Sequence, residues 1–113
     1  MVTDEQVISA LLVAGMEDWI ALDDVTWEAM KGNASDESKG RTIRILEHLF
    51  RAGLAVPGDL AEAGFEDWVG SPDEWVRRAR AELERLSWSP RGAGFWLRIT
   101  SVGEKAAREA RAQ

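Results

Sequence analysis

Four polar side chains recur at helical spacing near the middle of the chain, and they could recognise a charged partner. They are Arg41, Arg44, His48 and Arg51. On an α-helix these positions fall on one face. Arginines on such a face can contact guanine or phosphate in duplex DNA, and they can equally dock on an acidic protein surface. A simple solvated face is the third interpretation, because Glu37 and Glu47 flank the arginines and the net charge is −6.

Tryptophan is the second unusual feature, with six residues in a chain that has no tyrosine. Each indole can bury a large apolar area and needs one partner for its N–H group. The pattern predicts that Trp27, Trp75 and Trp96 face the core. The others lie at junctions between predicted elements, where they either fill joints or form an exposed patch for a protein partner. These junction residues are Trp19, Trp68 and Trp88.

Residues suited to catalysis or metal binding are scarce. The chain has no cysteine, which excludes disulfides, thiolate metal sites and cysteine nucleophiles. Its single histidine, His48, has no paired acid or nucleophile in the pattern, and the carboxylates do not follow a calcium-loop spacing. Gly92-Ala93-Gly94 is too short for a phosphate loop. We therefore expect no catalytic residue, metal or cofactor, and a protein that is not an enzyme.

Length and composition indicate one soluble domain. A chain of 113 residues with 45% hydrophobic and 30% charged residues is typical of a single globular unit. No apolar run is long enough to span a membrane, and Met1–Glu5 is acidic, unlike a secretory signal. Together with the absence of cysteine, this predicts a cytoplasmic protein. The acidic total opposes a domain-wide basic field for nucleic acid.

Capping residues and apolar periodicity predict five helices and two short strands. The helices are expected after Thr3, near Asp23, from about Glu37 to Ala52, after Ser71 and at Ser101. The strands are expected at Leu54–Val56, ended by Pro57-Gly58-Asp59, and at Phe95–Thr100. The basic outer face of the Ser71 helix is expected to pack near an acidic segment of the same chain.

Two short segments resemble each other. Gly15–Ile20 reads GMEDWI and Gly64–Val69 reads GFEDWV. We interpret them as two similar loop-to-helix joints, each of which docks one tryptophan, rather than as a duplication.

Two longer segments resemble the winged-helix domain superfamily. The segment SKGRTIRILEHLFRAGL (residues 38–54) looks like the third helix of such a domain and the Gly-Leu turn into its wing. LRITSVGE (residues 97–104) is similar to the returning wing strand and the turn into a closing helix. The resemblance implies an α+β winged-helix-like domain over residues 1–113: three N-terminal helices, a two-stranded wing hairpin and a closing helix. The enlarged wing, residues 57–94, would carry an inserted amphipathic helix.

Two functions follow as hypotheses. The acidic charge and the altered wing favour a small intracellular protein that acts through protein–protein contacts at the junction tryptophans and the arginine face. The alternative is a DNA-binding transcription regulator that uses Arg41, Arg44 and Arg51. The resemblance also implies that a homodimer could form through the terminal helices.

Overall fold

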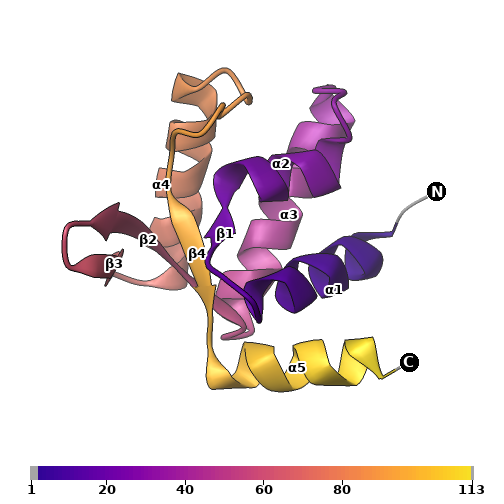
Figure 1. The fold of residues 1–113 in the computed structure, drawn as a ribbon. Coiled ribbons are helices and arrows are strands. Elements are labelled where there is room, and N and C mark those ends of the chain that lie inside the picture. Colours follow the sequence, from indigo (N-terminus) through magenta and orange to yellow (C-terminus); the bar gives the residue numbers. More distant parts are fainter. Residues whose placement is uncertain (1–2, 113) are drawn as a thin grey trace.

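The computed structural model describes residues 3–112, which form an α+β fold of five helices and a four-stranded antiparallel sheet (Figure 1). In chain order the elements are α1 (Asp4–Gly15), β1 (Ile20–Ala21), α2 (Leu22–Met30), α3 (Asp36–Arg51), β2 (Ala55–Ala61), β3 (Gly64–Asp67), α4 (Pro72–Arg85), β4 (Trp96–Ile99) and α5 (Ser101–Arg111). All five predicted helices are present, with ends that differ from the expected ones by a residue or two.

Local capping explains where the helices begin. The hydroxyls of Thr3 and Ser71 accept hydrogen bonds from the backbone N–H three residues later, as predicted. Ser35 caps α3 in the same way. The cap of α5 is Thr100 and not Ser101, since the Thr100 hydroxyl accepts from the Gly103 N–H at 3.1 Å. At the other end of α3, Gly53 has a positive φ of 70°, which lets the chain turn directly into β2.

The sheet is larger than the expected two-stranded hairpin. The predicted pair exists, because β2 and β4 are antiparallel with Ala55 opposite Ile99. However, β1 adds to β4 and β3 adds to β2, so that the strand order is β1-β4-β2-β3. The expectation that Pro57 ends the first strand is wrong. Its missing N–H does not interrupt pairing here, and its carbonyl accepts a hydrogen bond from the Trp68 N–H at 2.9 Å.

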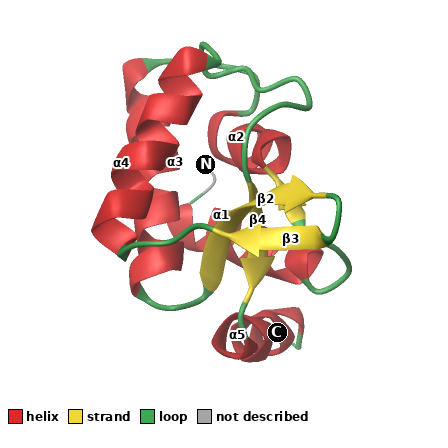
Figure 2. Ribbon diagram, turned by 90° about the vertical axis from the view of Figure 1, so that its left-hand side faces the viewer, coloured by secondary structure: helices red, strands yellow, loops and turns green. Residues whose placement is uncertain are grey.

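The helices enclose one core on one side of the sheet. The segment α4, which is inserted between β3 and β4, packs along α3, and both helices lie on the same side of the sheet (Figure 2). Phe50 of α3 and Trp75 of α4 meet edge to face with centroids 5.7 Å apart. Helix α5 packs on α1. The largest fully buried side chains are Val7, Leu11, Ile20, Leu22, Val25, Thr42, Ile45, Leu46, Leu49, Leu83, Phe95 and Leu97.

The two faces of the sheet differ in how they are covered. Residues opposite each other in register share a face, and successive residues alternate between faces. Ile20 and Leu97 are paired and fully buried, so their face looks into the core. The opposite face, which we call the open face, carries the pairs Val56–Arg98, Gly58–Trp96 and Leu60–Phe65, whose side chains other than Gly58 remain partly or largely accessible. This face is the one presented to the viewer in Figure 1.

Candidate functional site

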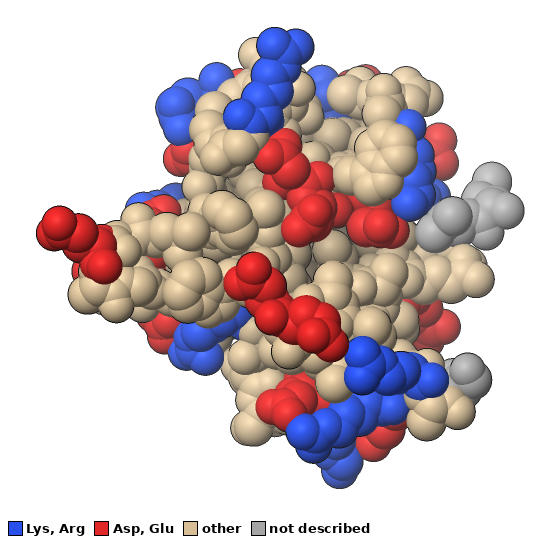
Figure 3. All heavy atoms as spheres, in the orientation of Figure 1, with Lys and Arg blue, Asp and Glu red and all other residues tan. Residues whose placement is uncertain are grey.

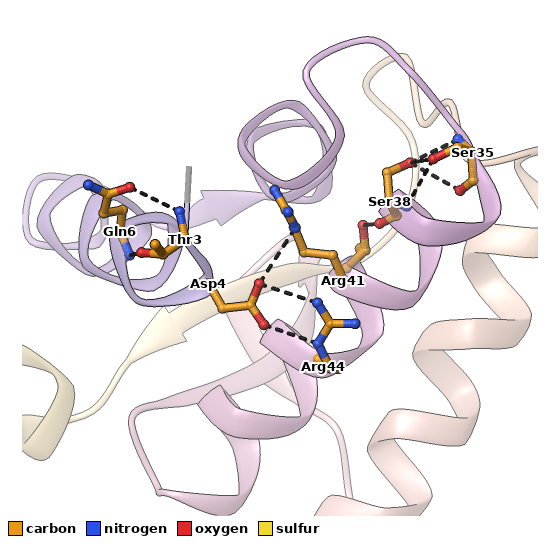
Figure 4. A network of polar contacts seen from close by, with 8 residues as sticks. Thr3, Asp4, Gln6, Ser35, Ser38, Arg41 and Arg44 are labelled. Atoms are coloured by element: carbon orange, nitrogen blue, oxygen red, sulfur yellow. Dashed lines mark hydrogen bonds and ion pairs between the residues drawn. The ribbon is translucent and has the colours of Figure 1, made fainter. Parts of the chain in front are cut away.

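The predicted arginine face of α3 is tied to α1 by a carboxylate. Arg44 donates from Nε to Asp4 Oδ2 at 3.0 Å and from Nη2 to Oδ1 at 3.4 Å (Figure 4). The hydrogen bond with Asp4 raises the pKa of Arg44, and the charge of Asp4 acts in the same direction. Arg41 turns toward the same carboxylate, with Nε 3.5 Å from Asp4 Oδ1, and only 20% of its side chain is exposed.

The other end of this face is tied to the inserted helix. Arg51 Nη2 lies 2.5 Å from Asp73 Oδ1 of α4 and 3.8 Å from Glu47 Oε2. The structure thus brings Arg44, His48 and Arg51 together as exposed residues on one face of α3, while Arg41 is half-buried. Each of the arginines already has a carboxylate within ion-pair distance, so the face carries little uncompensated positive charge.

Trp68, predicted as a partner-binding residue, is buried, with 5% of its surface exposed. Its indole N–H donates to Asp59 Oδ2 at 3.0 Å, and the Arg78 guanidinium lies 3.9 Å from its ring centroid. Arg78 also pairs with Asp59 at 3.3 Å. This arrangement joins the β2–β3 hairpin to α4 and confirms that the basic inserted helix packs against an acidic segment. Trp68 therefore has a structural role in the chain itself.

Trp88 is also buried, with 9% exposed, and cannot contribute to a surface patch. It lies just after α4 in a left-handed backbone conformation, where its N–H donates to the Leu83 carbonyl at 2.8 Å. The Lys39 ammonium lies 5.6 Å from its ring centroid. The expectation of an exposed patch made of all three junction tryptophans is wrong, because two of them fill joints between elements.

Trp19 behaves differently from the other two. It lies between α1 and β1, and 41% of its surface is exposed. Its ring contacts Phe65 of β3, with centroids 5.7 Å apart. Trp96 and Leu60 lie on the same open face. We call Trp19, Phe65 and Trp96 the open-face cluster.

A glycine makes this cluster feasible. A Cβ built on Gly58 would overlap the Phe65 ring and the Glu66 carbonyl oxygen. Trp96 lies directly opposite Gly58 in the register. Because Gly58 has no side chain, the Phe65 ring can lie over β2 at this position, on the same face as Trp96. The cluster is thus a consequence of the β2–β3 pairing.

One ion pair crosses the open face. Arg98 donates from Nε and Nη2 to the two carboxylate oxygens of Asp67, at 2.8 and 2.6 Å. The hydrogen bond from Arg98 lowers the pKa of Asp67, and the same bond raises the pKa of Arg98. Next to this pair, Glu17, Asp18, Trp19 and Arg98 line a hollow of about 390 Å³.

Sequence reasoning missed several of these surface residues. Phe65 and Leu60 were not predicted as surface residues, because the segment that contains Phe65 was interpreted as a joint and not as a strand. The signal that could have found it is alternation on both sides of a two-residue turn at residues 62–63. Trp27, expected in the core, is 59% exposed. A helical wheel would have shown this, because the buried residues of α2 lie on an arc that excludes position 27: they are Leu22, Val25, Thr26, Ala29 and Met30.

Trp75, also expected in the core, is half-buried and packs against it. The expectation that Trp96 faces the core is wrong, because the neighbouring Leu97 takes the core side of β4 and Trp96 therefore lies half-buried on the open face. Among residues 3–112, no three His, Asp or Glu side chains are grouped in a way that could hold a metal ion. None of the helices in that range combines the length and the apolar character needed to cross a lipid bilayer.

Comparison with models of protein families gave no match for this chain. Comparisons with curated proteins and with solved structures gave no match either.

Proposed function

We propose that the chain is a non-enzymatic protein-binding module of winged-helix-like architecture, and that it holds a protein partner against its open face. The winged-helix part of the proposal is supported by three helices that precede a β2–β4 pair, with β1 added beside β4 and α5 closing the chain. In this scaffold β3 and α4 are additions to the wing.

The observation that carries the proposal is the exposure of the open-face cluster. An indole that is 41% exposed lies against Phe65 on a sheet face that α3 and α4 leave uncovered (Figure 2). Tryptophan is enriched among the residues that dominate protein–protein binding energies, because it offers a large rigid surface. A partner that covers Trp19, Phe65 and Leu60 would remove this apolar area from water.

DNA binding through α3 has weaker support. The two exposed arginines of that helix, Arg44 and Arg51, are each engaged by carboxylates from α1 or α4. Phosphate contacts would have to replace these ion pairs in a molecule of net charge −6.

Site-specific photocrosslinking in the native cell tests the proposal. The photoreactive residue p-benzoylphenylalanine replaces Leu60, which is exposed on the open face. The matched controls place it at Val102 of α5 and at His48 of α3, which are also exposed. We expect a discrete protein adduct from position 60 that is absent from position 102. The proposal fails if position 60 gives no adduct, and a DNA adduct from position 48 would favour the alternative.

A further inference from the structure

We infer that the occupant of the open face is a basic polypeptide segment, one arginine or lysine of which lies over the Trp19 ring beside Glu17 and Asp18. The inference rests on the proposed function, since it names the chemistry of the partner that this face would hold.

Two tryptophans of the molecule occupy similar sequence contexts but have different neighbours. The segments GMEDWI and GFEDWV are similar, and each contains a tryptophan preceded by two acids. In the second, Trp68 has the Arg78 guanidinium 3.9 Å from its ring centroid and a carboxylate, Asp59, that binds both groups. Among residues 3–112, no lysine or arginine lies over the Trp19 ring in this way. An external cation would complete for Trp19 the arrangement that Arg78 completes for Trp68.

The hollow beside Trp19 is surrounded by more acidic than basic groups. The Glu17 side chain is 76% exposed, and its nearest cation is Arg111 at 3.4 Å. One oxygen of Asp18 accepts the Trp19 N–H at 2.7 Å, which leaves its other oxygen to accept from a partner. Arg98 also lines the hollow, but both of its hydrogen bonds go to Asp67. In and around the hollow, three carboxylates therefore stand against two guanidinium groups, and the excess charge is negative. The carboxylates are those of Glu17, Asp18 and Asp67, and the guanidinium groups are those of Arg98 and Arg111.

The wider surface has the same sign. Acidic side chains extend across the middle of this face and the tip of the β2–β3 hairpin, while most basic side chains lie toward its margins (Figure 3). Glu62 in the hairpin turn is exposed. A basic segment would therefore meet complementary charge across the middle of this face and at the hairpin tip, which favours encounter as well as binding.

The same charge argues against two other occupants. A second copy of the chain carries the same acids and a net charge of −6, so two open faces would repel each other. A nucleic acid would bring phosphates against Glu17, Asp18 and Glu62. A basic protein segment is the occupant that the charges accommodate.

A random library of 12-residue peptides displayed on phage tests the inference with the full chain as bait. Synthetic copies of the enriched peptides are then titrated against the wild-type chain and three variants. The variants are Trp19→Ala, the doubly neutralised Glu17→Gln with Asp18→Asn, and a control of equal charge change away from the open face, Glu84→Gln with Glu109→Gln. Sedimentation of the wild-type chain and of Trp19→Ala runs in parallel.

We expect enriched peptides with more lysine and arginine than the library average. Their affinity should fall at least about tenfold in Trp19→Ala and about threefold to tenfold in the neutralised double variant, while the control stays within about twofold of the wild type. Affinity should also weaken as salt is raised. Together these results would support the inference.

Other outcomes overturn it in distinguishable ways. Peptides that need Trp19 but are neutral or acidic would leave the proposed function standing and refute the basic partner. The absence of any peptide that needs Trp19 would refute both. A dimer that dissociates in Trp19→Ala would show that a second copy covers the face, against the inference.

Discussion

The outward face of α3 and the open face of the sheet are the two surfaces that could bind a partner, and they differ in what they leave unsatisfied. The α3 face is rich in charge, but Arg44 and Arg51 are held by Asp4 of α1 and Asp73 of α4. The open face has an aromatic cluster that α3 and α4 leave uncovered. The difference shows that a surface with many charged side chains is not thereby free to bind a partner, because those charges can already be paired within the chain. Binding at α3 must first break internal ion pairs, whereas binding at the open face removes apolar surface from water.

The largest expected effect is the difference in stability between alanine variants of the buried Trp68 and the exposed Trp19. Trp68→Ala should lower the free energy of unfolding by about 3–5 kcal/mol, because it empties a buried site and removes both the indole N–H that Asp59 accepts and the ring beside Arg78. Trp19→Ala should lower it by less, about 1–2 kcal/mol, because 41% of the residue is exposed to water in the folded chain already. Urea denaturation followed by far-UV circular dichroism measures both values. Equal losses would mean that Trp19 belongs to the core and that the open face is not a binding surface.

A glycine on each surface provides the next test. Gly58→Ala should destabilise the fold by about 1–3 kcal/mol, because the added methyl group collides with the Phe65 ring and the Glu66 carbonyl. Gly40→Ala, on α3, should stabilise it by about 0.5–1 kcal/mol, since the new Cβ meets nothing closer than Arg44 Nη1 at 3.8 Å. Thermal or urea unfolding distinguishes the two signs. A neutral Gly58→Ala would mean that the aromatic cluster does not depend on close packing over β2.

The third prediction frees the arginines of α3. Replacing Asp4 and Asp73 by asparagine should raise the affinity for a 20-base-pair duplex about threefold to tenfold at low salt, because Arg44 and Arg51 lose the carboxylates of α1 and α4 that hold them. The slope of log affinity against log salt should steepen by about one for each arginine that reaches a phosphate. Fluorescence anisotropy measures both quantities, with Glu84→Gln and Glu109→Gln as the control of equal net charge. If the wild-type chain bound the duplex tightly and Arg44→Ala abolished this binding, the α3 face and not the open face would be the binding surface.

The smallest effect concerns the ion pair that crosses the open face. Since Arg98 lowers the pKa of Asp67 in the folded chain, the unfolded chain takes up the proton first as the pH falls. The contribution of the pair is therefore complete above about pH 4 and disappears as the pH falls below that value. Asp67→Asn should be less stable than the wild type by about 0.2–1 kcal/mol at pH 7, a small difference because the pair is partly exposed. Urea denaturation at pH 7 and pH 3 should show this difference shrinking toward zero, and a constant difference would contradict the assignment.

Much of the fold could be predicted from local sequence. Thr3, Ser35 and Ser71 determine helix starts through bonds that span three residues, and the alternation of polar and apolar positions orients α3. These features depend only on neighbours along the chain. The missed strands β1 and β3 have two and four residues, and they exist because β4 and β2 lie beside them. The two residues of β1 carry too few alternating positions to predict a strand, and the alternation of β3 can be recognised only together with that of β2 across the turn.

The two similar segments separate what the sequence determined from what only the tertiary structure decided. The letters of GMEDWI and GFEDWV place a tryptophan after two acids in both, and they suggested equivalent docked joints. In the folded chain Trp68 lies on the covered side of the sheet under Arg78, and Trp19 lies beside the open face with 41% of its surface exposed. The sequence determined where the two tryptophans stand along the chain and which residues flank them. Only the tertiary structure decided that Trp68 is buried and Trp19 is exposed. The burial of a side chain depends on atoms contributed by distant segments, and the helices cover only one face of the sheet.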